Sequence, residues 1–225
     1  IPGPKNDNYG FTDVRVVDIF ESGSPEIMDS GAHIIVIGKF ENNEFVVKKT
    51  IDMKVVVPPA AHTREHAFIG AGNTDSDKGK ELVYIAGRDN QVSCYGPVIV
   101  TAMDINESYF VSNPRTSGYT QVCPVPLDLL VEDLNNDGIA EILTAAAGGD
   151  DERAAVFRKW ADTGTQLDLV QRYVIASSNS GGATTLFRTF DFNSDKIKEV
   201  IVTAVLSPEW YYGTPHTRIF NAHDR

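Results

Sequence analysis

The sequence lacks any run of about 18 consecutive apolar residues, the minimum length of a membrane-spanning helix. It is also poor in basic residues, since 20 Lys and Arg stand against 31 Asp and Glu, for a formal net charge of -11. Such an excess of negative charge repels phosphate backbones and anionic lipid surfaces. We therefore expect neither nucleic-acid binding nor insertion into a membrane.

Motifs for nucleophilic catalysis and nucleotide binding are missing as well. The chain contains no GxSxG, GxGxxG or P-loop pattern. Its two cysteines, Cys94 and Cys123, permit either one disulfide or two buried thiols, and the sequence leaves both open. The start of the chain, Ile1 to Pro4, shows neither an initiator Met nor a signal peptide, so we expect a processed form or a fragment.

The most informative stretch runs from Asp133 to Glu141 and reads DLNNDGIAE. It places side-chain oxygens at its first, third, fifth and ninth positions, with Gly138 where the backbone must turn sharply, and this pattern suits a hard cation such as Ca²⁺. An EF-hand is excluded, because its twelfth position is Thr144 and its flanks are short and strand-like. We expect a carboxylate-rich loop between two strands.

This loop pattern recurs along the chain at spacings of 55, 60 and 58 residues. The four loops begin at Asp18, Asn73, Asp133 and Asp191. Their ninth positions are all glutamate, namely Glu26, Glu81, Glu141 and Glu199. An apolar, strand-like segment precedes and follows each loop. The sequence therefore predicts four copies of one structural unit.

Between the loops the chain reads as further strands, with hairpin turns at 41–44 and 161–165. Four strands in a unit of this length match a blade of a β-propeller. We predict an all-β protein with four blades of four antiparallel strands in a single domain, 1–225. The expected blades are about 11–60, 61–122, 123–180 and 181–225. The fourth lacks an evident outermost strand, which favours an arc of a larger propeller, for example one with seven blades, over a closed ring.

The repeated pattern of apolar strand, DxNxDGxxE and apolar strand resembles FG-GAP/VCBS repeats, the blades of integrin-alpha-like propellers. The resemblance implies one to three Ca²⁺ ions, mainly structural. In the third unit the ligands would be the side chains of Asp133, Asn135, Asp137 and Glu141 with the carbonyl of Ile139. The second unit offers Asn73, Asp75, Asp77 and Glu81, and the fourth offers Asp191, Asn193, Asp195 and Glu199.

Three of the loops depart from this family pattern. Lys78 and Lys196 occupy the glycine position of the second and fourth loops. A lysine with positive φ costs roughly 1 kcal/mol or more. In the first loop Phe20 and Ser22 replace two ligands, so we expect no ion there.

Two further groups are candidates for ligand binding or catalysis. His62 and His66 precede the second unit's first strand and could bind a metal or act as base and acid; two loop histidines that only form hydrogen bonds are the simpler interpretation. The stretch 208–216 is rich in aromatics, too interrupted by polar residues for a strand, and offers Trp210, Tyr211, Tyr212 and His216 to a sugar or protein. An aromatic plug against the next blade is equally compatible.

These features favour a calcium-stabilised recognition module for glycans or protein partners over an enzyme. Segments 62–71 and 82–95 are also similar to the propeller of fungal aldos-2-ulose dehydratases, which implies a sugar lyase or dehydratase as an alternative. A structural domain of a larger secreted protein, with further blades, is a third hypothesis. The loop chemistry and the millimolar Ca²⁺ outside cells favour an extracellular location.

Overall fold

The computed structural model of this chain describes residues 13–31, 33–56, 66–87, 95–122, 125–147, 154–177, 183–209 and 212–221. Within these ranges it contains fifteen β-strands and one short helix. The strands form four separate antiparallel sheets, and in each sheet they follow one another in chain order. The prediction of an all-β protein built from antiparallel sheets is therefore confirmed.

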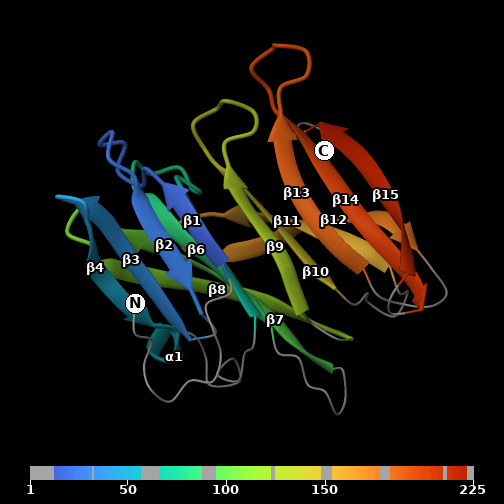
Figure 1. Cartoon of the computed structure of the whole chain (residues 1–225), viewed down its shortest axis with the longest axis horizontal. Helices are drawn as coiled ribbons and strands as arrows, with labels where there is room; N and C mark the ends of the chain where they lie inside the picture. Colours follow the sequence, from blue (N-terminus) through green and yellow to red (C-terminus); the bar gives the residue numbers. More distant parts are fainter. Residues whose placement is uncertain are drawn as a thin grey trace.

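Each sheet comes from one continuous part of the chain (Figure 1). The first contains β1 (Asp13–Val17), β2 (Glu26–Ser30), β3 (Ile34–Glu41) and β4 (Glu44–Asp52), followed by α1 (Met53–Val56). The second contains β5 (His66–Gly72), β6 (Lys80–Gly87), β7 (Tyr95–Ile105) and β8 (Val111–Val122). The third contains β9 (Val125–Glu132), β10 (Glu141–Ala147), β11 (Ala154–Asp162) and β12 (Leu167–Ser177). The fourth contains β13 (Ala183–Phe190), β14 (Glu199–Glu209) and β15 (Tyr212–Asn221).

Hydrophobic cores lie between consecutive sheets. In β6, Leu82 and Tyr84 pack toward the first sheet, whereas Val83 and Ile85 pack toward the third. Because successive side chains of a strand point to opposite faces, a strand covered on both sides must be apolar at nearly every position. A third core joins the third and fourth sheets, where the Phe157 ring stacks on that of Tyr173 at 4.3 Å between centroids.

The first strands of the four sheets lie next to one another in the order β1, β5, β9, β13. Aspartates tie them together: a carboxylate oxygen of Asp13 on β1 accepts the Ile69 N–H of β5 at 3.2 Å. In the same way Asp128 on β9 accepts the Phe187 N–H of β13 at 2.9 Å. Among the described residues the series does not close, and the first and fourth sheets lie at opposite ends of it (Figure 1).

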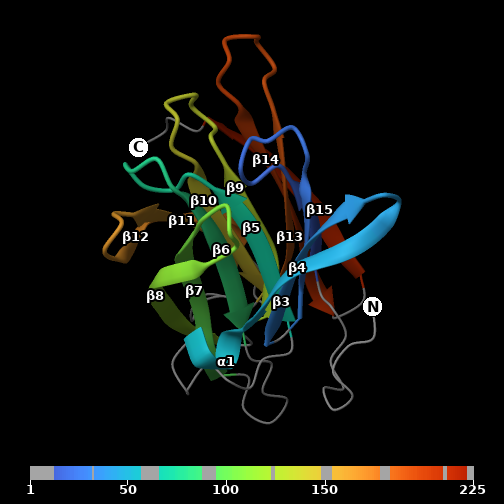
Figure 2. The same cartoon turned by 90° about the vertical axis from the view of Figure 1, so that its left-hand side faces the viewer.

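The four predicted polar loops each connect the first and second strands of a sheet, and all four project from the same end of the molecule (Figures 1 and 2). Backbone hydrogen bonds join neighbouring loops. Ala140 N–H donates to Asn73 O at 2.6 Å, and Lys198 N–H donates to Leu134 O at 2.8 Å. The second, third and fourth loops therefore form a connected row along this end.

One sequence interpretation is wrong: the stretch 208–216 is not a loop throughout. Pro208 and Glu209 belong to β14, and Tyr212 to His216 belong to β15. The two prolines are accommodated for different reasons. Pro208 lies at a register shift between Leu206 and Glu209, while Pro215 lies in β15, an edge strand of the sheet, where a missing N–H is tolerated.

In the part of the chain that the structure describes, no helix has the length and apolarity needed to cross a membrane.

Candidate metal centre

One hydrogen bond is common to all four loops. The glutamate at the ninth position accepts the backbone N–H of the second position, and this fixes the two ends of the loop against each other. The N–H of Ile19 donates to Glu26 at 2.9 Å, that of Thr74 to Glu81 at 2.5 Å, that of Leu134 to Glu141 at 3.0 Å and that of Phe192 to Glu199 at 3.0 Å. The glutamate that the sequence assigns to a cation thus also has a structural role.

The third and fourth loops share one backbone conformation. In the third, the carboxylate of Asp133 accepts the N–H groups of Asp137 and Gly138 at 3.2 and 2.9 Å. In the fourth, Asp191 accepts those of Asp195 and Lys196 at the same distances. Both loops have positive φ at the fourth and sixth positions: 59° and 91° at Asn136 and Gly138, 63° and 73° at Ser194 and Lys196. Lys196 therefore occupies the strained conformation that its position predicts, whereas Lys78 is not among the positive-φ residues.

Predicted ligands converge inside the third loop. The Asn135 amide nitrogen lies 2.9 Å from an Asp137 carboxylate oxygen and 3.1 Å from a Glu141 oxygen. Burial raises the pKa of Glu141 above its ordinary value, with the charge of Asp137 adding to the effect. The Asn135 amide oxygen accepts the Asp137 N–H at 3.0 Å, so Asp137 and Glu141 are the side chains whose carboxylate oxygens face this point and would suit a hard cation. Ile139, which would offer its carbonyl, is exposed.

The first loop has a lysine beside its glutamate. The Lys39 ammonium lies 2.6 Å from an oxygen of Glu26, which is fully buried, and the Tyr109 hydroxyl donates to the same oxygen at 3.1 Å. The hydrogen bond to Glu26 raises the pKa of Lys39, so the ammonium stays charged. A positive charge thus lies next to the ninth-position glutamate of this loop, closer than Lys159 lies to Glu141 in the third loop, at 3.7 Å. The absence of an ion from this loop stays a prediction.

The second loop is different, because three of its predicted ligands hold an oxygen without a hydrogen-bond partner. These buried atoms are Asn73 Oδ1, Asp75 Oδ2 and Glu81 Oε1, from the first, third and ninth positions of the loop. Asp75 is 3% exposed and Glu81 is 0% exposed. Unpartnered buried acceptors are costly, and a cation would satisfy those of Asp75 and Glu81, which lie close enough to share one ion. The second loop therefore fits a bound Ca²⁺.

The electrostatics of this loop point the same way. Burial, followed by the charges of Asp75 and Asp77, raises the pKa of Glu81 from 4.5 to about 7. Burial likewise raises the pKa of Asp75, and the charge of Asp77 adds to it. Both shifts mean that the site disfavours further negative charge unless a cation enters or a proton binds.

A third-sheet residue that the sequence analysis did not identify completes this group. Asp162, the last residue of β11, lies beside Asp75 and Glu81, and one ligand oxygen from each is within 4.8 Å of the others. Among the described residues these are the only three carboxylate, histidine or cysteine side chains so arranged. The hydroxyl of Thr74 links the two sheets, at 2.9 Å from Asp162 and 3.1 Å from Glu81. No motif could reveal Asp162, because it comes from another repeat.

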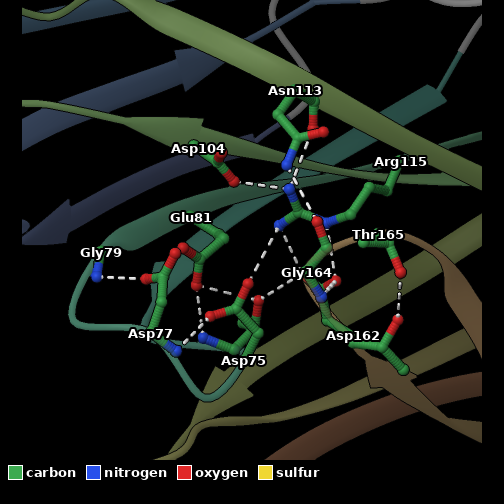
Figure 3. Close-up of polar contacts among 12 residues, drawn as sticks. Asp75, Asp77, Gly79, Glu81, Asp104, Asn113, Arg115, Asp162, Gly164 and Thr165 are labelled. Carbon is green, nitrogen blue, oxygen red and sulfur yellow. Dashed lines mark hydrogen bonds and ion pairs between the residues drawn. The ribbon is translucent and has the colours of Figure 1, made fainter.

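Arg115 of β8 fixes Asp162 in place (Figure 3). Its guanidinium donates Nε to Asp162 Oδ1 at 2.7 Å and Nη2 to Asp162 Oδ2 at 2.6 Å, and Nη1 lies 2.5 Å from Asp104. Its Nη2 is 3.9 Å from Asp75 Oδ2, beyond hydrogen-bonding distance. Asp162 and Asp104 thus share one buried positive charge, with Asp75 close to it.

The other predicted site residues lie away from the loops or outside the described ranges. His62, Trp210, Tyr211, Cys94 and Cys123 are outside those ranges. His66 begins β5, Tyr212 begins β15, and His216 pairs with Ala204 in the same ladder. His66 and Tyr212 therefore lie at the end of the sheets opposite the polar loops, in the second and fourth sheets, and neither adjoins a predicted cation ligand.

No protein-family model matches this chain, and no curated protein matches it. The chemistry of the site is therefore inferred from its own residues and geometry.

Proposed function

We propose that this chain is a calcium-stabilised β-propeller module that recognises glycans or protein partners outside the cell. The observation that carries the proposal is the recurrence of one polar loop, with carboxylate and amide oxygens gathered inside it, at the same end of all four sheets. Loops of this kind take up a hard cation and thereby fix the turn between two strands.

The calcium ligands come from the second, third and fourth loops. Asp133, Asn135, Asp137 and Glu141, with the Ile139 carbonyl, form the set in the third loop, and the fourth loop offers Asp191, Asn193, Asp195 and Glu199. In the second loop Asn73, Asp75 and Glu81 supply oxygens, and Asp77 accepts the N–H of Gly79. When bound, the cation neutralises these carboxylates and stiffens the turn. The chain's own hydrogen bonds hold the ligand side chains in position for it.

The propeller is supported by the repeated packing of one sheet on the next and by what remains uncovered at the two ends of the series. Val14 and Val16 of β1 are 59% and 64% exposed, while Leu186 and Phe190 of β13 are 46% and 58% exposed. Val14 and Val16 lie on one face of β1, and Leu186 and Phe190 on one face of β13, so these exposed apolar side chains fit sheet faces that further blades would cover. We place the four sheets in an arc of a larger propeller.

Recognition is assigned to Trp210 and Tyr211, which follow β14 in the sequence, and to Tyr212, the first residue of β15. β14 ends and β15 begins at the end of the sheet opposite the polar loops, so a ligand bound there would not compete with the cations. Aromatic faces stack on sugar rings and also serve as anchors in protein interfaces.

Calorimetric titration and thermal unfolding of chelator-treated protein test the calcium part. At about 100 times the dissociation constant, bound Ca²⁺ should stabilise the fold by about 3 kcal/mol per site, enough to raise Tm by roughly 5–10 °C. A protein shown to be metal-free that gains no stability in millimolar Ca²⁺ would refute this part. Mg²⁺, which prefers a tighter octahedral shell, serves as the control cation.

Glycan-array binding and partner capture in Ca²⁺ test the recognition part. We expect binding to be lost in Trp210→Ala and Tyr211→Ala and kept in His62→Ala and His66→Ala. The opposite result, together with turnover of a keto-sugar or uronic-acid substrate, would favour the lyase or dehydratase hypothesis.

A further inference from the structure

We infer that the cation site of the second loop is shared between two sheets: Asp162 of the third sheet acts as a ligand beside Asp75 and Glu81. A hard divalent cation held there would clamp the second and third sheets together. The inference rests on the proposed function for the presence of cation-binding loops, and it adds a ligand that the loop pattern does not contain.

The first argument is the unsatisfied oxygens. Asp75 Oδ2 and Glu81 Oε1 are buried without a hydrogen-bond partner, and both side chains are at least nine-tenths buried. One carboxylate oxygen from each of Asp75, Glu81 and Asp162 lies within 4.8 Å of the other two. That limit is twice the Ca–O distance of about 2.4 Å, so one Ca²⁺ can contact an oxygen of each side chain.

The second argument is the charge. Asp75, Glu81 and Asp162 bring three negative charges into a buried space, and Arg115 brings one positive charge. Asp104 also pairs with Arg115 and adds a further negative charge, so an excess of negative charge remains, which a divalent cation would reduce. Buried carboxylates without a counter-charge are strongly disfavoured, and a ligand set made only of oxygen selects a hard cation.

The third argument is that a turn of the third sheet, at Gly164, packs closely against the second loop. Gly164, in the turn after Asp162, has φ +79°, and a Cβ added there would lie 2.9 Å from Asp75 Oδ2. Asn113 of β8 donates its side-chain N–H to Gly164 O at 2.9 Å, and Gly164 N–H donates to Asp162 at 3.0 Å. The turn is thus held directly over the loop by contacts from both sheets.

Asp162 can bind a cation without losing its ion pair with Arg115. Its oxygen Oδ2 receives Arg115 Nη2 and the Thr74 hydroxyl. The single hydroxyl hydrogen of Thr74 can turn to Glu81 Oε2, 3.1 Å away, and so release a lone pair of Asp162 for the cation. The bidentate pair with Arg115 would then orient Asp162 during binding.

The test is calorimetric titration of the whole chain with Ca²⁺, comparing wild type with Asp162→Asn and Asp168→Asn. Asp168 is an exposed carboxylate on β12 in the same hairpin, so its substitution makes the same chemical change away from the site. We expect Asp162→Asn to weaken one site at least about tenfold and to leave the others, because ligand charge sets affinity. Asp168→Asn should match wild type.

The outcomes separate this inference from the proposed function. If wild type binds no Ca²⁺, the calcium part of the proposed function fails. If wild type binds Ca²⁺ and Asp162→Asn binds it with the same number of sites and affinities, only the shared site is refuted. Asp137→Asn, in the third loop, should weaken a different site and leave the Asp162-dependent one unchanged.

A second variant covers the case in which Asp162→Asn does not fold for lack of a partner for Arg115. The double variant Arg115→Gln/Asp162→Asn replaces the ion pair with a neutral, hydrogen-bonding one, and circular dichroism checks its fold. It should also lack the shared site; wild-type binding in this variant would overturn the inference. Hydrogen exchange adds a direct readout of the clamp: Ca²⁺ should slow exchange in the 162–165 turn of wild type, and protection confined to 73–81 would contradict it.

Discussion

Arg15 of the first sheet donates Nη2 to a carboxylate oxygen of Asp128, on the first strand of the third sheet, at 2.9 Å. This hydrogen bond links the first and third sheets directly, although β5, the first strand of the second sheet, contacts both β1 and β9. The opposite oxygen of Asp128 accepts the Phe187 N–H of the fourth sheet. One buried carboxylate thus connects three of the four sheets.

Replacing Asp128 should therefore destabilise the whole series of sheets. Asp128→Ala removes the acceptors for Arg15 and for the Phe187 N–H, and the expected cost is about 3 kcal/mol in the free energy of unfolding. Urea unfolding followed by tryptophan fluorescence measures it. Asp168→Ala, an exposed carboxylate, is the control and should change stability by less than about 0.5 kcal/mol. Equal effects of the two substitutions would contradict the linking role of Asp128.

Gly164→Ala should cost more than Gly23→Ala, although both glycines have nearly the same backbone. Their φ values are +79° and +74°, so each substitution carries a strain of about 1 kcal/mol. A Cβ at Gly23 has no atom within 4 Å, whereas at Gly164 it would lie 2.9 Å from Asp75. We expect an extra loss of roughly 1 kcal/mol for Gly164→Ala in thermal unfolding. Equal costs would show that the approach of the turn to the loop is unimportant.

Lys39→Met should destabilise the first sheet, because it leaves the fully buried Glu26 without its positive partner. Breaking a buried ion pair on one side costs about 3 kcal/mol or more. Lys48→Met is the matched control, since its partner Glu41 is 44% exposed and such surface pairs contribute at most about 1 kcal/mol. Chemical unfolding of both variants checks the difference. Similar losses would contradict a stabilising role for the buried Lys39–Glu26 pair.

The stability of the metal-free protein should fall as the pH rises from about 5.5 to 7.5. The folded-state pKa of Glu81, about 7, lies above its ordinary value of 4.5, so between these values the folded protein holds a proton that the unfolded chain has lost. The resulting stabilisation is fully present below about pH 4.5 and is lost as the pH rises through 7. Between pH 5.5 and 7.5 the free energy of unfolding should fall by about 2 kcal/mol.

Glu81→Gln provides the comparison, because the amide keeps the shape of the side chain and removes its titration. In urea unfolding at several pH values with chelator present, the variant should show a flatter dependence than wild type. A variant with the same slope would assign the pH effect to other carboxylates.

Much of the strand order was predictable, because the signals are local. The turn at 41–44 is an example: Asn42 and Asn43 adopt φ of 53° and 65°, and Glu41 pairs with Glu44 across the hairpin. Asparagine tolerates this conformation, and the apolar strands on both sides fix the register. The same reasoning failed at Pro208 and Pro215, where position in the sheet, at a bulge and on an edge, mattered more than residue type.

By itself the sequence determined the repeat, the four polar loops and the strands on both sides of each loop. These features depend on neighbours within about ten residues, through backbone hydrogen bonds, alternating apolar side chains and turn preferences. Only the tertiary structure decided what stands beside each loop: Lys39 beside Glu26 in the first, and Asp162 beside Asp75 and Glu81 in the second. The contact between Thr74 and Asp162 joins residues 88 positions apart, and that of Arg115 with Asp162 joins residues 47 apart. The partners of Asp162 are selected by the packing of one sheet on the next, so no spacing within a repeat could reveal them, whereas Lys39 and Glu26 meet through the pairing of β2 with β3 in one sheet.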